Sequence, residues 1–228
     1  MSTARVALAI AAKDLRIERR SRVMLNQVLP FSGVVMVLFA FALDKANLLS
    51  RVAPGLIWMA TLFSLLVMVQ RSFAVETDDR AFDALAVAGL SPTGLFLGKS
   101  LALAVQLLVL DVVLVLLAVV LYETKIHGGG RLALAAVTIV AAVSVLAGIG
   151  TLYGGLAAGS KGRDTLLPLL LLPMAAPVVI GATRSMEAAF ATGGIAMREG
   201  WAWAGLLVAL GVLTTVGGAL GFSALIEE

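Results

Sequence analysis

Six long apolar runs constrain the fold of this chain more than any other feature of its sequence. About 20 residues of helix cross the hydrocarbon core of a bilayer, and each run is about that long or longer. No ten-residue units alternate with period two, which excludes a transmembrane barrel. The sequence therefore predicts an all-α integral membrane protein with one membrane domain, residues 1–228. The spans are expected at about 24–43, 52–70, 95–121, 131–157, 165–183 and 202–225.

Composition supports this assignment and excludes several classes of function. The chain is 61% hydrophobic and 14% charged, whereas soluble domains are nearer half apolar and a quarter charged. The formal charge of +3 does not indicate nucleic-acid binding, because the basic residues cluster beside the spans. There is no cysteine and only one histidine, His127. A disulfide, a thiolate nucleophile and a His-cluster metal site are excluded, and His127 is expected to be solvated, with a ligand role as the alternative.

The distribution of Lys and Arg predicts the orientation, since cytoplasmic loops carry the excess. With the N-terminus inside, eleven bases lie inside and six outside. Both termini are therefore expected on the cytoplasmic side of the membrane. The aromatic residues Trp58, Tyr122, Trp201 and Trp203 fall at predicted outer ends, where an interfacial belt is expected.

The segment before the first span is rich in bases. Arg5 precedes an apolar stretch of only seven residues, which continues into KDLRIERRSR. Seven residues are at the lower limit for the apolar core of a secretory signal, so a cleaved signal is the less favoured alternative. We expect an N-terminal helix that lies on the cytoplasmic membrane surface.

An acidic insert, QRSFAVETDDRAFDALAVAGLSP (70–92), separates the second and third spans. Thr77 or Asp78 can cap a helix whose apolar face includes Phe82, and Pro92 ends the segment. A helix over about 77–90 is too short to span a membrane. It is either a solvated connector or a helix that docks on a cytoplasmic partner.

Two patterns within the spans concern helix packing and bending. Gly150 and Gly154 are four residues apart, a spacing that lets apolar helices approach closely. Pro168, Pro173 and Pro177 lie in one span, and each removes a backbone donor. They predict either a simple kink or a mobile, re-entrant element.

Asp111 lies deep in the third span, where a carboxyl group is costly. It either pairs with a neighbouring helix or serves transport and coupling. The stretch GLFLGKS (94–100) has one residue too few for a phosphate-binding loop. No catalytic constellation is present, so we expect a non-catalytic subunit that relies on ATP hydrolysis by another polypeptide.

Three stretches carry a resemblance to a known family. They are RVAPGLIWMATLFSLLVMVQRSFAVE (51–76), DDRAFDALAVAGLSP (78–92) and LLLPMAAPVVIGAT (170–183). They resemble the CcmB family, the permease-like membrane component of the haem ABC exporter in cytochrome c maturation. The similarity covers about residues 13–183 and is most specific over 51–92.

The resemblance implies a six-helix, ABC-2-like permease, present in two copies with two ABC ATPase subunits (CcmA-like). Other implied partners are a haem-handling membrane protein, a small membrane protein and a haem chaperone outside. The insert would be a coupling helix that docks on the ATPase. The family's Phe-x-x-Asp motif reads Phe73-Ala-Val-Glu76 here, with a longer acidic arm. The docking residues implied are Phe73, Glu76, Asp78, Asp79, Phe82 and Asp83.

The resemblance leaves the role of the chain open. Haem iron prefers His, Cys, Met or Tyr ligands, and this chain has one His, no Cys, eight Met and two Tyr. The chain either exports haem or transmits the work of the ATPase so that the loaded chaperone is released. The sequence slightly favours transmission, with no cofactor bound directly. The alternative is an ABC-2 permease that exports a lipid or another hydrophobic substrate.

Overall fold

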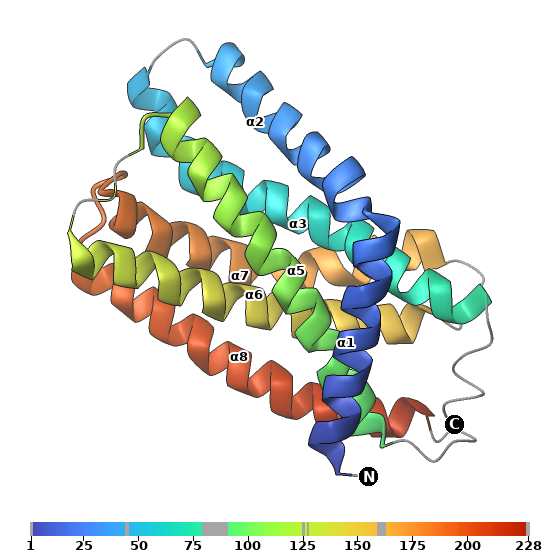
Figure 1. Cartoon of the computed structure of the whole chain (residues 1–228). Coiled ribbons are helices and arrows are strands. Elements are labelled where there is room, and N and C mark those ends of the chain that lie inside the picture. Colours follow the sequence, from blue (N-terminus) through green and yellow to red (C-terminus); the bar gives the residue numbers. More distant parts are fainter. Residues whose placement is uncertain are drawn as a thin grey trace.

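The computed structural model describes residues 2–43, 46–78, 91–124, 126, 128–158 and 163–226. Every regular element within these ranges is helical (Figure 1), which confirms the predicted class. The elements are α1 (Thr3–Ser21), a π-helix (Met24–Val28), α2 (Leu29–Ala42), α3 (Ala46–Asp78), α5 (Pro92–Leu121), α6 (Gly129–Ala158), α7 (Arg163–Phe190) and α8 (Met197–Ile226).

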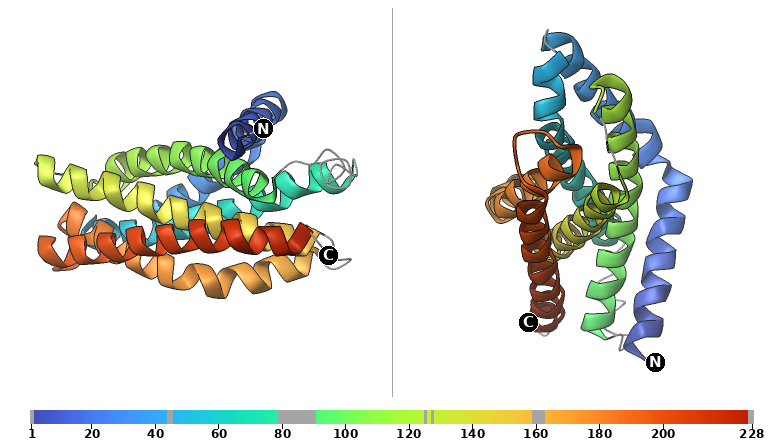
Figure 2. Two further views of the ribbon diagram at one scale, coloured as in Figure 1. Left: turned by 90° about the horizontal axis from the view of Figure 1, so that it is seen from below. Right: turned by 90° about the vertical axis from the view of Figure 1, so that its left-hand side faces the viewer.

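Six helical segments are long and apolar enough to cross a membrane, as predicted. The π-helix and α2 together form the first, Met24–Ala42, and α3, α5, α6, α7 and α8 supply the others. An even number of spans returns a chain to its starting side. The two ends of the chain do lie at the same end of the bundle (Figures 1 and 2).

Helix α3 is much longer than the predicted span at 52–70. It continues without a break from Ala46 to Asp78, over 33 residues, which is about 50 Å at 1.5 Å per residue. The predicted capping residues Thr77 and Asp78 belong to α3 by their backbone, because no Gly or Pro between positions 71 and 78 interrupts that helix. The remainder of the predicted coupling helix, 79–90, lies outside the described residues.

Helix α7 also continues beyond its predicted end at residue 183. It includes Pro168, Pro173 and Pro177 within one continuous helix that ends at Phe190. The helical backbone favours a tolerated bend over a re-entrant element. Pro173 and Pro177 lie on the exposed side of α7.

The centre of the bundle is formed by α3 and α6. Within their apolar windows 61% and 67% of the residues are buried, against 17% for the first and last spans. Side-chain hydrogen bonds tie the outer α2 to α3 and to the residue that follows α5. The hydroxyls of Ser32 and Ser64 lie 2.9 Å apart, and the Tyr122 hydroxyl donates to the carbonyl of Met36 at 2.8 Å.

The predicted aromatic belt is only partly present. Trp58 is fully buried and Tyr122 is 1% exposed, so both rings fill the interior of the bundle. Trp201 is 41% exposed, and Trp203 is partly exposed. The first two rings pack inside because α3 and α5 lie between other helices, so they do not support the predicted orientation.

Gly150 and Gly154 lie at a close contact between α6 and α3. A Cβ atom at Gly150 would lie 2.9 Å from Val69 Cγ2, and one at Gly154 would lie 2.5 Å from Phe73 Cε2. Such distances are shorter than a van der Waals contact between carbon atoms. These glycines therefore let α6 approach the half of α3 that leads to the acidic insert.

The N-terminal helix α1 packs on the first turns of α5. Its buried residues include Val6, Ala7 and Ile10. A Cβ atom at Gly98 of α5 would lie 2.6 Å from the carbonyl oxygen of Ala7, and one at Gly94 would lie 2.9 Å from Val6 Cβ. The N-terminal segment is therefore a helix with one face buried against α5, and its place on the membrane surface stays a prediction.

The glycine contacts generate a first prediction. Gly154→Ala is expected to lower the free energy of unfolding by about 1–3 kcal/mol, because the new methyl group overlaps Phe73. Gly217→Ala is the matched control, because a Cβ atom there meets nothing within 4 Å. The control is expected to leave stability unchanged or slightly raised. Thermal unfolding of both variants in detergent measures this difference, and equal midpoints would contradict the packing described.

Candidate functional site

A buried lysine lies where three helices meet. Lys99 stands near the start of α5, and its side chain is 1% exposed. Burying an ammonium group is costly unless other groups replace its hydration. The partners of Lys99 therefore show which elements the fold holds together at this position.

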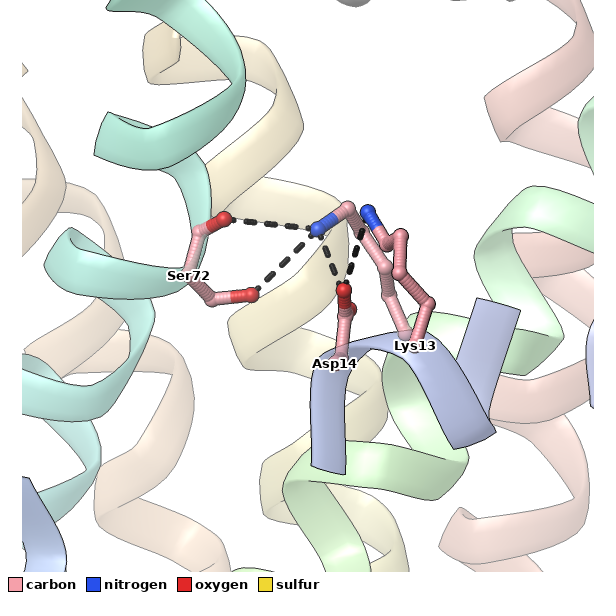
Figure 3. A network of polar contacts seen from close by, with 4 residues as sticks. Lys13, Asp14 and Ser72 are labelled. Carbon is pink, nitrogen blue, oxygen red and sulfur yellow. Dashed lines mark hydrogen bonds and ion pairs between the residues drawn. The ribbon is translucent and has the colours of Figure 1, made fainter. Parts of the chain in front are cut away.

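The partners come from α1 and α3 (Figure 3). Lys99 Nζ lies 3.4 Å from Asp14 Oδ2 of α1, 3.3 Å from Ser72 Oγ of α3 and 3.4 Å from the Ser72 carbonyl oxygen. Asp14 also pairs with Lys13, whose Nζ lies 3.0 Å from Oδ1. We call Lys99, Asp14, Ser72 and Phe73 the lysine junction.

Phe73 completes the junction from α3. Lys99 Nζ lies over the ring, 4.7 Å from its centroid, within the range of a cation–π contact. The ring is 2% exposed and packs against Gly154 of α6. The expectation that Phe73 anchors a partner protein is therefore not supported, because the ring is already enclosed by the chain's own helices.

The junction has a mechanical consequence. The Asp14 side chain is 11% exposed and that of Lys99 is 1% exposed, so water screens their attraction little. Separating α1 from α5 would break the contact of Lys99 with Asp14 and expose both charges, and separating α3 from α5 would break the contacts with Ser72. The arrangement can therefore hold α1, α3 and α5 together when one of them is displaced.

The sequence alone does not reveal this site. Lys99 belongs to GLFLGKS, whose spacing invites comparison only with a phosphate-binding loop. Two signals are nevertheless present: a lysine inside an apolar run, and Gly94 and Gly98 four residues apart just before it. Together they indicate a helix that packs closely on this turn and supplies an acid. The identity of that helix is not readable from the sequence.

The other residues predicted to dock on an ATPase are placed only in part. Glu76 and Asp78 belong to the last turns of α3 by their backbone. Asp79, Phe82 and Asp83 lie outside the described residues, so their docking role stays a prediction. The lysine junction is only one helical turn before Glu76 along α3.

Asp111 lies elsewhere in the bundle and is fully buried. The hydroxyl of Thr61 in α3 donates to its Oδ1 atom and lies 2.9 Å from the carbonyl of Ile57. Its second oxygen has no hydrogen-bond partner among the described residues. The contact links α3 to α5, as the structural alternative for Asp111 expects. A role in transport or coupling remains a prediction.

Within the described ranges, no three His, Asp or Glu side chains gather as metal ligands would. His127 lies outside those ranges.

Comparison with known proteins gives consistent similarities. The family model described as CcmB protein matches residues 5–227. A protein of Rhodobacter capsulatus named Heme exporter protein B is 29% identical over 174 residues, covering 75% of this chain and 78% of its own. The protein of the same name in Haemophilus influenzae is 30% identical over 188 residues, which cover 81% of this chain and 82% of the relative. The Heme exporter protein B of Escherichia coli K12 is 30% identical over 177 residues, which cover 77% of this chain and 79% of the relative.

The junction generates a second prediction. Lys99→Met removes the contacts to Asp14 and Ser72, and is expected to lower the free energy of unfolding by about 1–3 kcal/mol. It is also expected to make α1 more accessible to protease. Lys13→Met is the matched control, since Lys13 pairs with the same carboxylate but its side chain is 45% exposed. An exposed pair contributes about 0–1 kcal/mol.

Limited proteolysis and thermal unfolding in detergent measure both variants. If Lys99→Met and Lys13→Met release α1 at the same rate, the buried lysine does not hold the three helices together.

Proposed function

Because the chain belongs to the CcmB family, we propose that it is the membrane subunit of a bacterial haem exporter complex that serves cytochrome c maturation. In this proposal a partner ABC ATPase hydrolyses ATP, and this chain couples that hydrolysis to haem delivery or to release of the haem-loaded chaperone outside. The chain has no catalytic role of its own. It resides in the inner membrane with both termini in the cytoplasm.

The observation that carries the coupling role is the continuity of α3. One uninterrupted helix contains the second span and extends to Asp78, directly before the acidic insert. The lysine junction connects α3 to α1 and α5 near that end. A displacement applied at the insert would therefore move α1, α3 and α5 together, because no loop interrupts α3 between the insert and the second span.

The ATPase is proposed to bind the insert as it would bind the coupling helix of an ABC-2-like permease. Glu76, Asp78, Asp79 and Asp83 would pair with basic groups on the ATPase, and Phe82 would supply apolar contact. Phe73 would act differently, since it is enclosed by the bundle and contacts Lys99. It would pass movement inward without touching the partner.

The exposed side of α7 supports a further contact within the complex. Pro173 and Pro177 lie on that side, and each leaves a backbone carbonyl without its helical donor. Such carbonyls need partners in hydrocarbon. A second copy of this chain is the proposed occupant, in a complex that also contains the haem-handling membrane protein, the small membrane protein and the chaperone.

Within this proposal we favour transmission of work over passage of haem. The apolar groove between α6 and α8, about 610 Å³, is lined by residues such as Val140, Ser144, Val212 and Thr215. The lining includes none of the His, Met or Tyr side chains that bind haem iron. The same groove is the observation that favours the alternative, export of a lipid or another hydrophobic substrate.

Charge reversal tests the docking proposal. Asp79→Lys with Asp83→Lys is expected to reduce co-purification of the ATPase at least tenfold, because two attractive contacts become repulsive. Glu123→Lys is the control, since it lies at the opposite end of α5 from the insert. If the ATPase still co-purifies stoichiometrically with the double variant, the insert is not the docking segment.

Reconstituted vesicles distinguish transmission from export. With the ATPase, the haem-handling membrane protein and the chaperone present, we expect ATP-dependent release of loaded chaperone without net haem flux. Haem flux that proceeds without the haem-handling protein would overturn transmission and support export. ATP-dependent movement of a labelled lipid would instead support the alternative permease.

A further inference from the structure

The chain makes a fixed corner between α1 and the first span. Arg22 has a φ of +52°, a left-handed conformation that is uncommon for a residue other than glycine. The π-helix Met24–Val28 follows at once, and such elements occur often at functional sites. Glu18 Oε1 accepts the backbone N–H of Met24 at 2.6 Å, which holds the corner closed.

A small pocket of about 90 Å³ lies inside this corner, between α1, the π-helix and α3. Pockets for drug-sized ligands measure about 300–1,000 Å³, so this one admits a compact group and excludes haem. Its polar lining includes Lys13, Asp14, Glu18 and Arg71, and its apolar lining includes Val28 and Met68.

The position of the pocket along the bundle indicates the kind of ligand. The first span begins at Met24 and the second ends at Phe73, and the pocket is lined by residues from both of these ends. It therefore lies at the level where hydrocarbon gives way to headgroups. Val28 and Met68 form its apolar inner wall, where both side chains are buried between the first two spans.

The charges of the pocket are balanced, with two basic and two acidic side chains. Lys13 pairs with Asp14, and Glu18 is bound to the Met24 amide. Arg71 is exposed and has no ion pair or hydrogen bond with any residue that the structure describes. An unpaired guanidinium is well suited to a phosphate oxygen. The carboxylate of Glu18 is suited to an ammonium group.

We propose that this pocket binds the headgroup of a zwitterionic phospholipid, phosphatidylethanolamine. Arg71 contacts its phosphate, the Glu18 carboxylate faces its ammonium group, and its acyl chains extend into the surrounding bilayer. A free phosphate fits less well, because it would bind Arg71 but offer no ammonium group to the Glu18 carboxylate. The bound lipid stabilises the corner between α1 and the first span.

Native mass spectrometry of the full chain in detergent tests this proposal. The purified protein is offered phosphatidylethanolamine or phosphatidylglycerol at equal concentration. We expect one phosphatidylethanolamine molecule to be retained, and Arg71→Gln to weaken its retention about tenfold, as expected for one lost charge-assisted contact. Arg51→Gln is the matched control, since Arg51 is an exposed base near the other end of α3.

Retention of phosphatidylethanolamine by Arg71→Gln at the level of the wild type would overturn the proposal. Equal retention of phosphatidylglycerol would overturn the zwitterionic assignment. A thermal-shift measurement with inorganic phosphate separates the two sources of phosphate. If inorganic phosphate alone raises the thermal unfolding midpoint as much as the lipid does, the ligand of the pocket is a free anion and the lipid proposal is overturned.

Discussion

Polar groups placed among apolar helices must find their partners within the protein, and the arrangement of this bundle depends on that constraint. The ammonium of Lys99 finds Asp14 and Ser72, and Asp111 finds Thr61. Both contacts join helices that are distant in sequence. Because hydrocarbon offers no replacement for these partners, each contact fixes the position of one helix against another.

The two contacts have different places in the proposed mechanism. The Asp111 contact joins α3 to α5 inside the bundle, where it maintains the distance between two spans. The lysine junction lies near the end of α3 that leads to the acidic insert, and it adds α1 to the same pair of helices. Movement that arrives from the insert therefore reaches α1, α3 and α5 together.

The sequence is sufficient for features that depend on local composition. Six apolar runs predict six spans, and Gly150 with Gly154 predicts close packing, because both depend on residue type and spacing alone. The sequence predicts that the second span ends at residue 70, where charged residues begin, but α3 continues to Asp78. Charged residues alone do not end a helix, and no Gly or Pro follows residue 70 before Asp78. Phe73 resembles a docking residue because sequence cannot show that Gly154 and Lys99 enclose its ring. The junction itself depends on tertiary contacts between positions 14, 72 and 99.

The most direct test measures c-type cytochromes by haem staining in a strain that lacks this protein. The strain is complemented with the wild type or with Lys99→Met, and membrane insertion and ATPase binding are verified for each. The account predicts that the wild type restores every c-type cytochrome, whereas Lys99→Met inserts and binds the ATPase but restores few. Full restoration by Lys99→Met would contradict coupling through the lysine junction, and cytochromes that persist without the protein would contradict its role in their maturation.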